Sequence, residues 1–154
     1  HEGYLDAFFA QALMPRRTSF LAKNTEFKNP LFRYVLKVFR AIPVRRYEID
    51  PTCVRNTLKM LALGHPVGIF VEGERTWDGL FLPPKRGAVK LLLRAGVPIV
   101  PVRIKGSFDM LPRWDKRPQW SRVQLLIGQP FNLDPKIRNV DAASKKIMEA
   151  LAKL

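Results

Sequence analysis

The sequence predicts an α/β protein: a single three-layer domain with a mostly parallel central sheet and helices on both of its faces. Short apolar segments typical of strands alternate along the chain with segments whose apolar residues recur every three or four positions, as in amphipathic helices. Strands that alternate with helices form parallel sheets covered on both faces. The chain has 154 residues, of which 47% are hydrophobic, so it is long enough to bury one core. We therefore expect one domain over residues 1–154.

The expected elements follow in this order. A helix over about 6–14 and a short strand at 19–22 come first, and the clearest helix of the chain lies within 29–42. Asn29 suits the capping position of that helix, and Pro30 suits its first turn. Next come a strand edge at 42–46, a helix capped by Asp50 and closed by Gly64, and a buried strand at 66–73. The last elements are a helix at 87–96, strands at 97–104 and 122–128 on either side of a proline-rich loop, and a helix over about 141–154.

The helix within 29–42 has a pronounced apolar stripe. Its cations, Arg33, Lys37 and Arg40, fall on the other side of the helix. The ordinary behaviour of amphipathic helices predicts that the stripe faces the sheet. The alternative is that the helix lies against anionic lipid. The stripe consists of Leu31, Phe32, Val35, Val38, Phe39 and Ile42.

The charge of the chain points to an anionic partner. The formal net charge is +14, from 27 basic and 13 acidic side chains. Residues 16–46 carry nine Lys or Arg against the single acid Glu26, and residues 85–122 carry ten against Asp109 and Asp115. Clustered cations suit nucleic acid, an anionic bilayer surface or a phosphorylated small substrate. The charge alone does not choose among these three.

Several classes of protein are disfavoured by the composition. Cys53 is the only cysteine, so no internal disulfide forms, and with only His1 and His65 beside it we expect no metal site. No apolar stretch reaches the 18 or so residues that cross a bilayer, and nothing resembles a signal peptide. Because the chain begins on His1, we expect it to be a piece of a longer protein.

Two short stretches carry residues suited to catalysis and binding. In "HEGYLD", a turn through Gly3 would let Asp6 reach back to His1, and a carboxylate that holds one imidazole nitrogen makes the other a better proton acceptor. In "VEGERTWDG", which follows an expected strand, a glycine allows close backbone approach and an arginine supplies a forked cation for phosphate. Each stretch alone is also compatible with an ordinary surface loop.

Four blocks of the chain, taken together, resemble the glycerolipid acyltransferases, most of all the bacterial 1-acylglycerol-3-phosphate (lysophosphatidic acid) acyltransferases. The H-x-x-x-x-D block resembles 1–6, and the second block resembles "RAIPVRR" at 40–46. The third, usually F-P-E-G-T-R-S, is similar to "FVEGERT" at 70–76, and the proline-bearing fourth to "VPIVPV" at 97–102. Val71 stands where the family usually has proline, and Glu74 where it usually has threonine. The resemblance implies a glycerol-3-phosphate acyltransferase-like fold.

The resemblance implies an O-acyltransferase of phospholipid synthesis, with roles for seven residues. His1 would be the general base that deprotonates the acceptor hydroxyl, and Asp6 would hold its tautomer. Backbone amides near Gly73 would stabilise the oxyanion, and Glu72 would position Arg75 or a ligand hydroxyl. Arg75 is the first choice for the acceptor phosphate, and Lys23 and Arg45 are the next choices.

The implied partners are a lysophospholipid or glycerol phosphate acceptor and an acyl donor. Acyl-CoA or acyl carrier protein would deliver the acyl group as substrate, and no cofactor is expected. We expect association with an anionic membrane surface at its cytoplasmic face, with Trp114 and Trp120 among the cations of "LPRWDKRPQW" as candidate contacts. The alternatives are acylation of glycerol 3-phosphate or another lysolipid. A basic nucleic-acid-binding module is a further alternative, but no motif supports it and no nucleic acid is expected.

Overall fold

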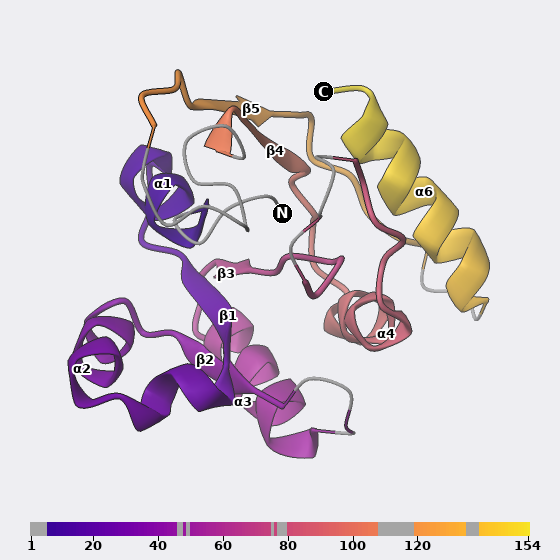
Figure 1. Ribbon diagram of the computed structural model, residues 1–154. Coiled ribbons are helices and arrows are strands. Elements are labelled where there is room, and N and C mark those ends of the chain that lie inside the picture. Colours follow the sequence, from indigo (N-terminus) through magenta and orange to yellow (C-terminus); the bar gives the residue numbers. More distant parts are fainter. Residues whose placement is uncertain are drawn as a thin grey trace. The chain divides into compact units, whose positions relative to one another are not determined.

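Figure 1 shows the computed structural model, which describes residues 6–45, 48, 50–74, 76, 80–107, 119–134 and 139–154. The described residues of 6–13 and 71–154 form one compact unit, and residues 14–70 form a second. Each unit has its own sheet. The α/β class and the predominance of parallel strands are confirmed, whereas one domain over residues 1–154 stays a prediction.

The unit of residues 14–70 is built on three parallel strands. These are β1 (Ser19–Lys23), β2 (Ile42–Val44) and β3 (Val67–Gly68), in the order β2-β1-β3. In the register Lys23 lies opposite Val44, so the carboxyl ends of β1 and β2 coincide. The helices of this unit are the short 3-10 helix η1 (Asn24–Lys28), α2 (Pro30–Val38) and α3 (Pro51–Ala62). The predicted caps of α2 and α3, Asn29 and Asp50, are confirmed.

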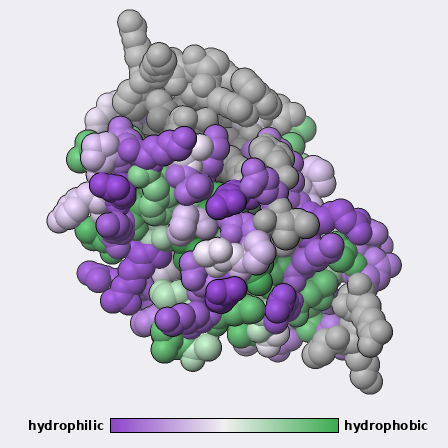
Figure 2. All heavy atoms as spheres, turned by 90° about the horizontal axis from the view of Figure 1, so that it is seen from below, coloured by the Kyte–Doolittle hydropathy of each residue, from purple (hydrophilic) through white to green (hydrophobic). Residues whose placement is uncertain are grey.

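Helix α2 differs from its prediction in length and in packing. It ends at Val38, and Ile42 belongs to β2 instead. No residue of α2 is buried, and the helix packs mainly against η1. The prediction that its apolar stripe faces the sheet is therefore wrong. Figure 2 views the molecule from below and shows hydrophobic areas, in green, that reach the surface among hydrophilic ones.

The predicted buried strand at 66–73 is also largely wrong. Only Val67 and Gly68 are paired, opposite Ser19 and Phe20 of β1, and the chain turns at 71–74. Gly68 is needed at this contact, because an added Cβ would lie 2.3 Å from the Phe20 ring. An apolar run indicates burial, but a strand also needs a neighbour with which to pair, and the sequence does not show the neighbour.

The unit of residues 6–13 and 71–154 combines helices with an antiparallel pair. Its elements are α1 (Asp6–Leu13), α4 (Arg86–Ala95), β4 (Val102–Lys105), β5 (Gln124–Ile127) and α6 (Val140–Ala152). Strands β4 and β5 run antiparallel, and the bridge between Ile99 and Phe131 extends their pairing. Parallel neighbours need a crossover connection, usually a helix. The sequence between these strands predicts a proline-rich loop, which accounts for the antiparallel direction.

The core of this unit lies between α4 and α6. Val89 of α4 packs with Ala143 and Ile147 of α6, and Leu133 completes the buried cluster. Val71, the residue that replaces the usual proline of the third block, is half-buried against the same cluster. The departure from the family pattern at position 71 therefore anchors the loop at 71–74 to the core.

Candidate active site

Asp6 occupies a fully buried position at the start of α1. A carboxylate in the first turn of a helix interacts favourably with the positive end of the helix dipole. A fully buried acid is uncommon and is found mainly where its charge is used or compensated. His1, the predicted partner of Asp6, lies outside the described residues, so the pairing of the two stays a prediction.

Glu72 is the second buried acid of this unit, and it lies close enough to Asp6 for their charges to interact. Burial raises the pKa of the Glu72 carboxyl, and the neighbouring charge of Asp6 acts in the same direction. The backbone N–H of Leu82 donates a hydrogen bond to the carboxylate and partly opposes the increase in pKa. The structure thus buries the acids of the first and third blocks in one unit and within electrostatic range of each other, although they are 66 positions apart in the sequence.

The loop at 71–74 is held by Lys85, a residue that the sequence did not single out. The backbone N–H of Lys85 donates to the Val71 carbonyl at 2.8 Å, and its Nζ lies 2.5 Å from Glu74 Oε1. Gly73 has a φ of +69°, and a Cβ added there would lie 3.0 Å from Cγ of Lys85. Gly73 therefore permits close approach of the Lys85 side chain, whereas close approach of a ligand at this glycine stays a prediction.

Glu74 replaces the usual threonine of the third block, and its contact with Lys85 explains how the chain accommodates a carboxylate there. The two residues are eleven positions apart, a spacing that no helix or strand periodicity indicates. Thr76 and Ser107 are further buried polar residues of the same unit that the sequence did not single out. Arg75, the first choice for the acceptor phosphate, lies outside the described residues.

Lys23 and Arg45 lie at the same edge of the three-stranded sheet. Lys23 ends β1 opposite Val44, and Arg45 directly follows Val44 at the end of β2. Parallel strands of α/β sheets carry their binding residues at this carboxyl edge. The structure therefore brings these two predicted cations together within the unit of residues 14–70.

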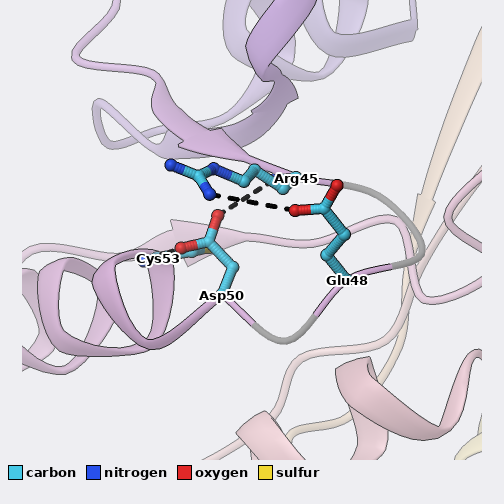
Figure 3. Close-up of polar contacts among 4 residues, drawn as sticks. All are labelled: Arg45, Glu48, Asp50 and Cys53. Atoms are coloured by element: carbon cyan, nitrogen blue, oxygen red, sulfur yellow. Dashed lines mark hydrogen bonds and ion pairs between the residues drawn. The ribbon is translucent and has the colours of Figure 1, made fainter.

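The backbone around Arg45 is fixed by Asp50, as Figure 3 shows. Asp50 accepts hydrogen bonds from the backbone N–H groups of Arg45 and Cys53, both at 2.9 Å. The hydrogen bond from Cys53, followed by that from Arg45, lowers the pKa of the Asp50 carboxyl. The Arg45 guanidinium lies 3.8 Å from Glu48, and both side chains are 64% exposed. Since exposed pairs are weak, the guanidinium remains accessible to an anionic ligand.

No group of three or more metal-ligating side chains occurs among the residues that the structure describes. Over the same residues, none of the helices has the length and hydropathy required to cross a bilayer.

The sequence of the chain is similar to those of known acyltransferases. The chain is 30% identical over 133 residues to the 1-acyl-sn-glycerol-3-phosphate acyltransferase of Bacillus subtilis, which covers 86% of this chain and 64% of that protein. It is 26% identical over 156 residues to the chloroplastic 1-acyl-sn-glycerol-3-phosphate acyltransferase BAT2 of Brassica napus, covering 98% of this chain and 44% of that protein. The chain thus spans about half to two thirds of the length of these relatives.

The fold is similar to that of a solved structure, the 1-acyl-sn-glycerophosphate (LPA) acyltransferase PlsC from Thermotoga maritima. The TM-score is 0.77 at 21% sequence identity, over 99% of this chain and 61% of that one. A family model described as Acyltransferase matches residues 1–105, which is more than half of the chain and includes all four blocks. The protein therefore belongs to the acyltransferase family.

Proposed function

We propose that the protein is an O-acyltransferase that moves a fatty acyl group to the hydroxyl of a lysophosphatidic acid-type acceptor in phospholipid synthesis. The observation that carries this proposal is the placement of Asp6, the acid of the first block, fully buried in the same unit as the buried Glu72 of the third block and within electrostatic range of it. The names of the bacterial and chloroplastic relatives support the same acceptor. Glycerol 3-phosphate and other lysolipids are the alternative acceptors.

In the proposed reaction His1 accepts the proton of the acceptor hydroxyl while the oxygen attacks the thioester carbonyl of the acyl donor. The carbon–oxygen bond forms, the carbon–sulfur bond breaks, and the departing thiolate takes the proton from the His1 imidazolium. The donor is acyl-CoA or acyl carrier protein, and no resident cofactor is needed. Asp6 would hold the tautomer of His1 and stabilise its charged form, which suits a carboxylate fixed at a helix start.

The remaining roles follow from the chemistry of the side chains. Arg75 would bind two oxygens of the acceptor phosphate, and Lys23 and Arg45 are the next candidates for that role. Glu72 would position its neighbours rather than contact the phosphate, because its charge would repel that ligand. Backbone N–H groups near Gly73 would donate to the oxyanion of the tetrahedral intermediate.

The proposed acceptor is a membrane lipid, so we also propose that the protein associates with an anionic membrane surface at its cytoplasmic face. The net charge of +14 supports such a partner. Trp114 lies outside the described residues, whereas Trp120 is described and fully exposed to solvent.

The test is an acyl-transfer assay with the full-length protein and its His1→Ala variant. A panel of lysolipids and glycerol 3-phosphate would be offered with labelled acyl-CoA and labelled acyl carrier protein. We expect transfer to lysophosphatidic acid and a loss of about a hundred-fold or more in His1→Ala. His65→Ala replaces the other histidine and is the matched control, which should retain activity. Near-normal turnover in a folded His1→Ala protein would contradict the mechanism. Salt-sensitive nucleic-acid binding without transfer to any acceptor would favour the nucleic-acid module instead.

A further inference from the structure

Helix α2 carries large apolar side chains that the fold leaves in contact with solvent. Leu31 and Tyr34 are each 70% exposed, and Val38 is 53% exposed. Including Phe32 and Phe39, residues 31–39 hold five of the thirteen exposed large hydrophobic residues in the described part of the chain. Monomeric proteins rarely concentrate exposed apolar side chains in this way unless the surface binds something.

Helix α2 carries exposed cations on a different side from its exposed apolar residues. Leu31, Tyr34 and Val38 are spaced by three and four residues, so they form one stripe along the helix. Arg33 and Lys37 lie one turn apart on α2 and Arg40 follows the end of the helix, and all three are exposed. Over residues 16–45 the sequence holds eight Lys or Arg and one acid, Glu26. The surface is therefore both apolar and strongly cationic.

The helix is fixed at both ends before any partner binds. The Asn29 side chain accepts hydrogen bonds from the N–H groups of Leu31 and Phe32 at its start. At its end, Ala41 N–H donates to the Leu36 carbonyl and Arg40 N–H to the Lys37 carbonyl, the two hydrogen bonds of a Schellman motif. A preformed helix loses less entropy on binding than a disordered segment.

Arg40 occupies the position of that motif at which glycine is usual. Its φ is +51°, in the left-handed region that disfavours side chains, and among the described residues it is the only non-glycine with positive φ. An arginine at a strained position points to a use for its side chain, which adds an exposed cation just beyond the end of α2.

We propose that α2, with its apolar stripe of Leu31, Tyr34 and Val38 and the exposed cations Arg33, Lys37 and the adjoining Arg40, docks on an anionic phospholipid bilayer. The helix lies along the headgroup layer, where the apolar residues enter the acyl boundary and the cations pair with lipid phosphates. The proposal rests on the proposed function for its choice of a lipid partner. A second copy of this chain is disfavoured, because pairing two such surfaces would place cation against cation.

The test is co-sedimentation of the full chain with vesicles of phosphatidylglycerol and phosphatidylcholine, compared with vesicles of phosphatidylcholine alone. We expect the wild-type chain to prefer the anionic vesicles. Leu31→Ser should weaken its binding about tenfold, and Arg40→Gly about fivefold. The matched controls are Leu63→Ser and Lys59→Gln, which remove an exposed leucine and an exposed lysine of the α3 region, and they should bind as the wild-type chain does.

Arg40→Gly distinguishes lost binding from lost folding, because glycine suits a φ of +51°. Its melting temperature should equal or exceed that of the wild-type chain while its vesicle binding falls. Equal binding of the wild-type chain to both kinds of vesicle would overturn the proposal. The proposal would also be overturned if both variants bound the anionic vesicles as tightly as the wild-type chain does. Binding of an acidic carrier protein through Leu31 and Arg40, without binding of vesicles, would overturn it too.

Failure of this proposal is separable from failure of the proposed function. Transfer to a detergent-dispersed lysolipid does not require a bilayer, so Leu31→Ser should keep that activity. If no acceptor is acylated but vesicle binding still depends on Leu31 and Arg40, the proposed function fails and the docking surface stands. If acyl transfer proceeds but neither variant affects vesicle binding, the docking surface fails and the proposed function stands.

Discussion

Glu72 keeps a carboxyl group where its charge is unfavourable. Because burial raises its pKa in the folded state, the folded chain binds this proton more tightly than the unfolded chain does. The free energy of unfolding should therefore fall as the pH rises from about 4.5, the unfolded value, through the folded pKa. One such group changes the stability by at most about 1.4 kcal/mol per pH unit.

We expect Glu72→Gln to abolish the decrease in the free energy of unfolding with rising pH, because the amide side chain does not titrate in this range. Urea unfolding of the wild-type chain and of the variant at several pH values from 4 to 8 measures the difference. Glu149→Gln, at an exposed position of α6, is the matched control and should follow the wild-type curve. If the free energies of unfolding of the wild-type chain and of Glu72→Gln differed by a constant amount from pH 4 to 8, the pKa of Glu72 would not be raised in the folded state.

Arg75 tests whether the third block binds the acceptor phosphate. Arg75→Lys keeps the positive charge but loses the planar fork, so acceptor efficiency should fall by about ten- to a hundred-fold while binding of the acyl donor is retained. The measurement compares a phosphorylated acceptor with the same acceptor lacking its phosphate, in the wild-type enzyme and in the variant. An equal loss for both acceptors would remove Arg75 from the phosphate site.

Some residues of the candidate active site could be predicted from the sequence, whereas some of the contacts that hold them could not. It singled out Asp6 and Glu72 through their blocks, but their proximity depends on the fold, because one begins α1 and the other precedes α4 by fourteen positions. It also singled out Lys23, after an expected strand, and Arg45, within an expected strand edge, but their common edge follows only from the register of β1 and β2. The contact of Lys85 with Glu74 was missed because no local pattern links a loop residue to a helix cap eleven positions later.

Asp50 joins the end of β2 to the start of α3. Its carboxylate accepts from the N–H groups of both Arg45 and Cys53, so Asp50→Ala loses a helix cap and a strand-to-helix contact together. We expect a loss of about 1 to 2 kcal/mol in the free energy of unfolding at neutral pH, measured by urea denaturation.

The pH dependence of Asp50 has the opposite sign to that of Glu72. Its pKa is lowered in the folded state, so its contribution is present above the unfolded value of 3.8 and is lost as the pH falls through the folded pKa. Asp50→Asn can still cap the helix but does not titrate. Its free energy of unfolding should therefore lie below that of the wild-type chain at neutral pH, and this difference should shrink in acid. A deficit that stays constant down to low pH would contradict the role of the Asp50 charge.

Helix ends were predictable from the sequence, whereas burial and pairing were less so. Caps such as Asn29 and Asp50 act within three residues, so local sequence specifies them. The periodicity of α2 correctly predicted a helix with an apolar stripe, but the same stripe suits a core or a lipid surface. The antiparallel pairing of β4 with β5 and the short β3 depend on neighbours distant in sequence, which periodicity does not report.

The excess of positive charge over the whole chain destabilises the folded state through repulsion. The chain carries 27 basic and 13 acidic side chains, and folding brings the excess cations closer together. The described ion pairs, such as Lys85–Glu74 and Arg86–Asp141, are largely exposed and contribute little individually. Repulsion among the unpaired cations should therefore outweigh the attraction within these pairs.

A salt titration should consequently change stability and membrane binding in opposite directions. Raising the ionic strength from about 0.01 M to about 0.15 M shortens the screening length from about 30 Å to about 8 Å. We expect the melting temperature to rise, because repulsion is screened, while binding to anionic vesicles falls, because attraction to lipid phosphate is screened as well. Sodium chloride and sodium fluoride should act alike if screening, rather than binding of a particular anion, is the cause. A melting temperature that falls with both salts would mean that attractive pairs, rather than repulsion among the excess cations, dominate the electrostatics of the fold.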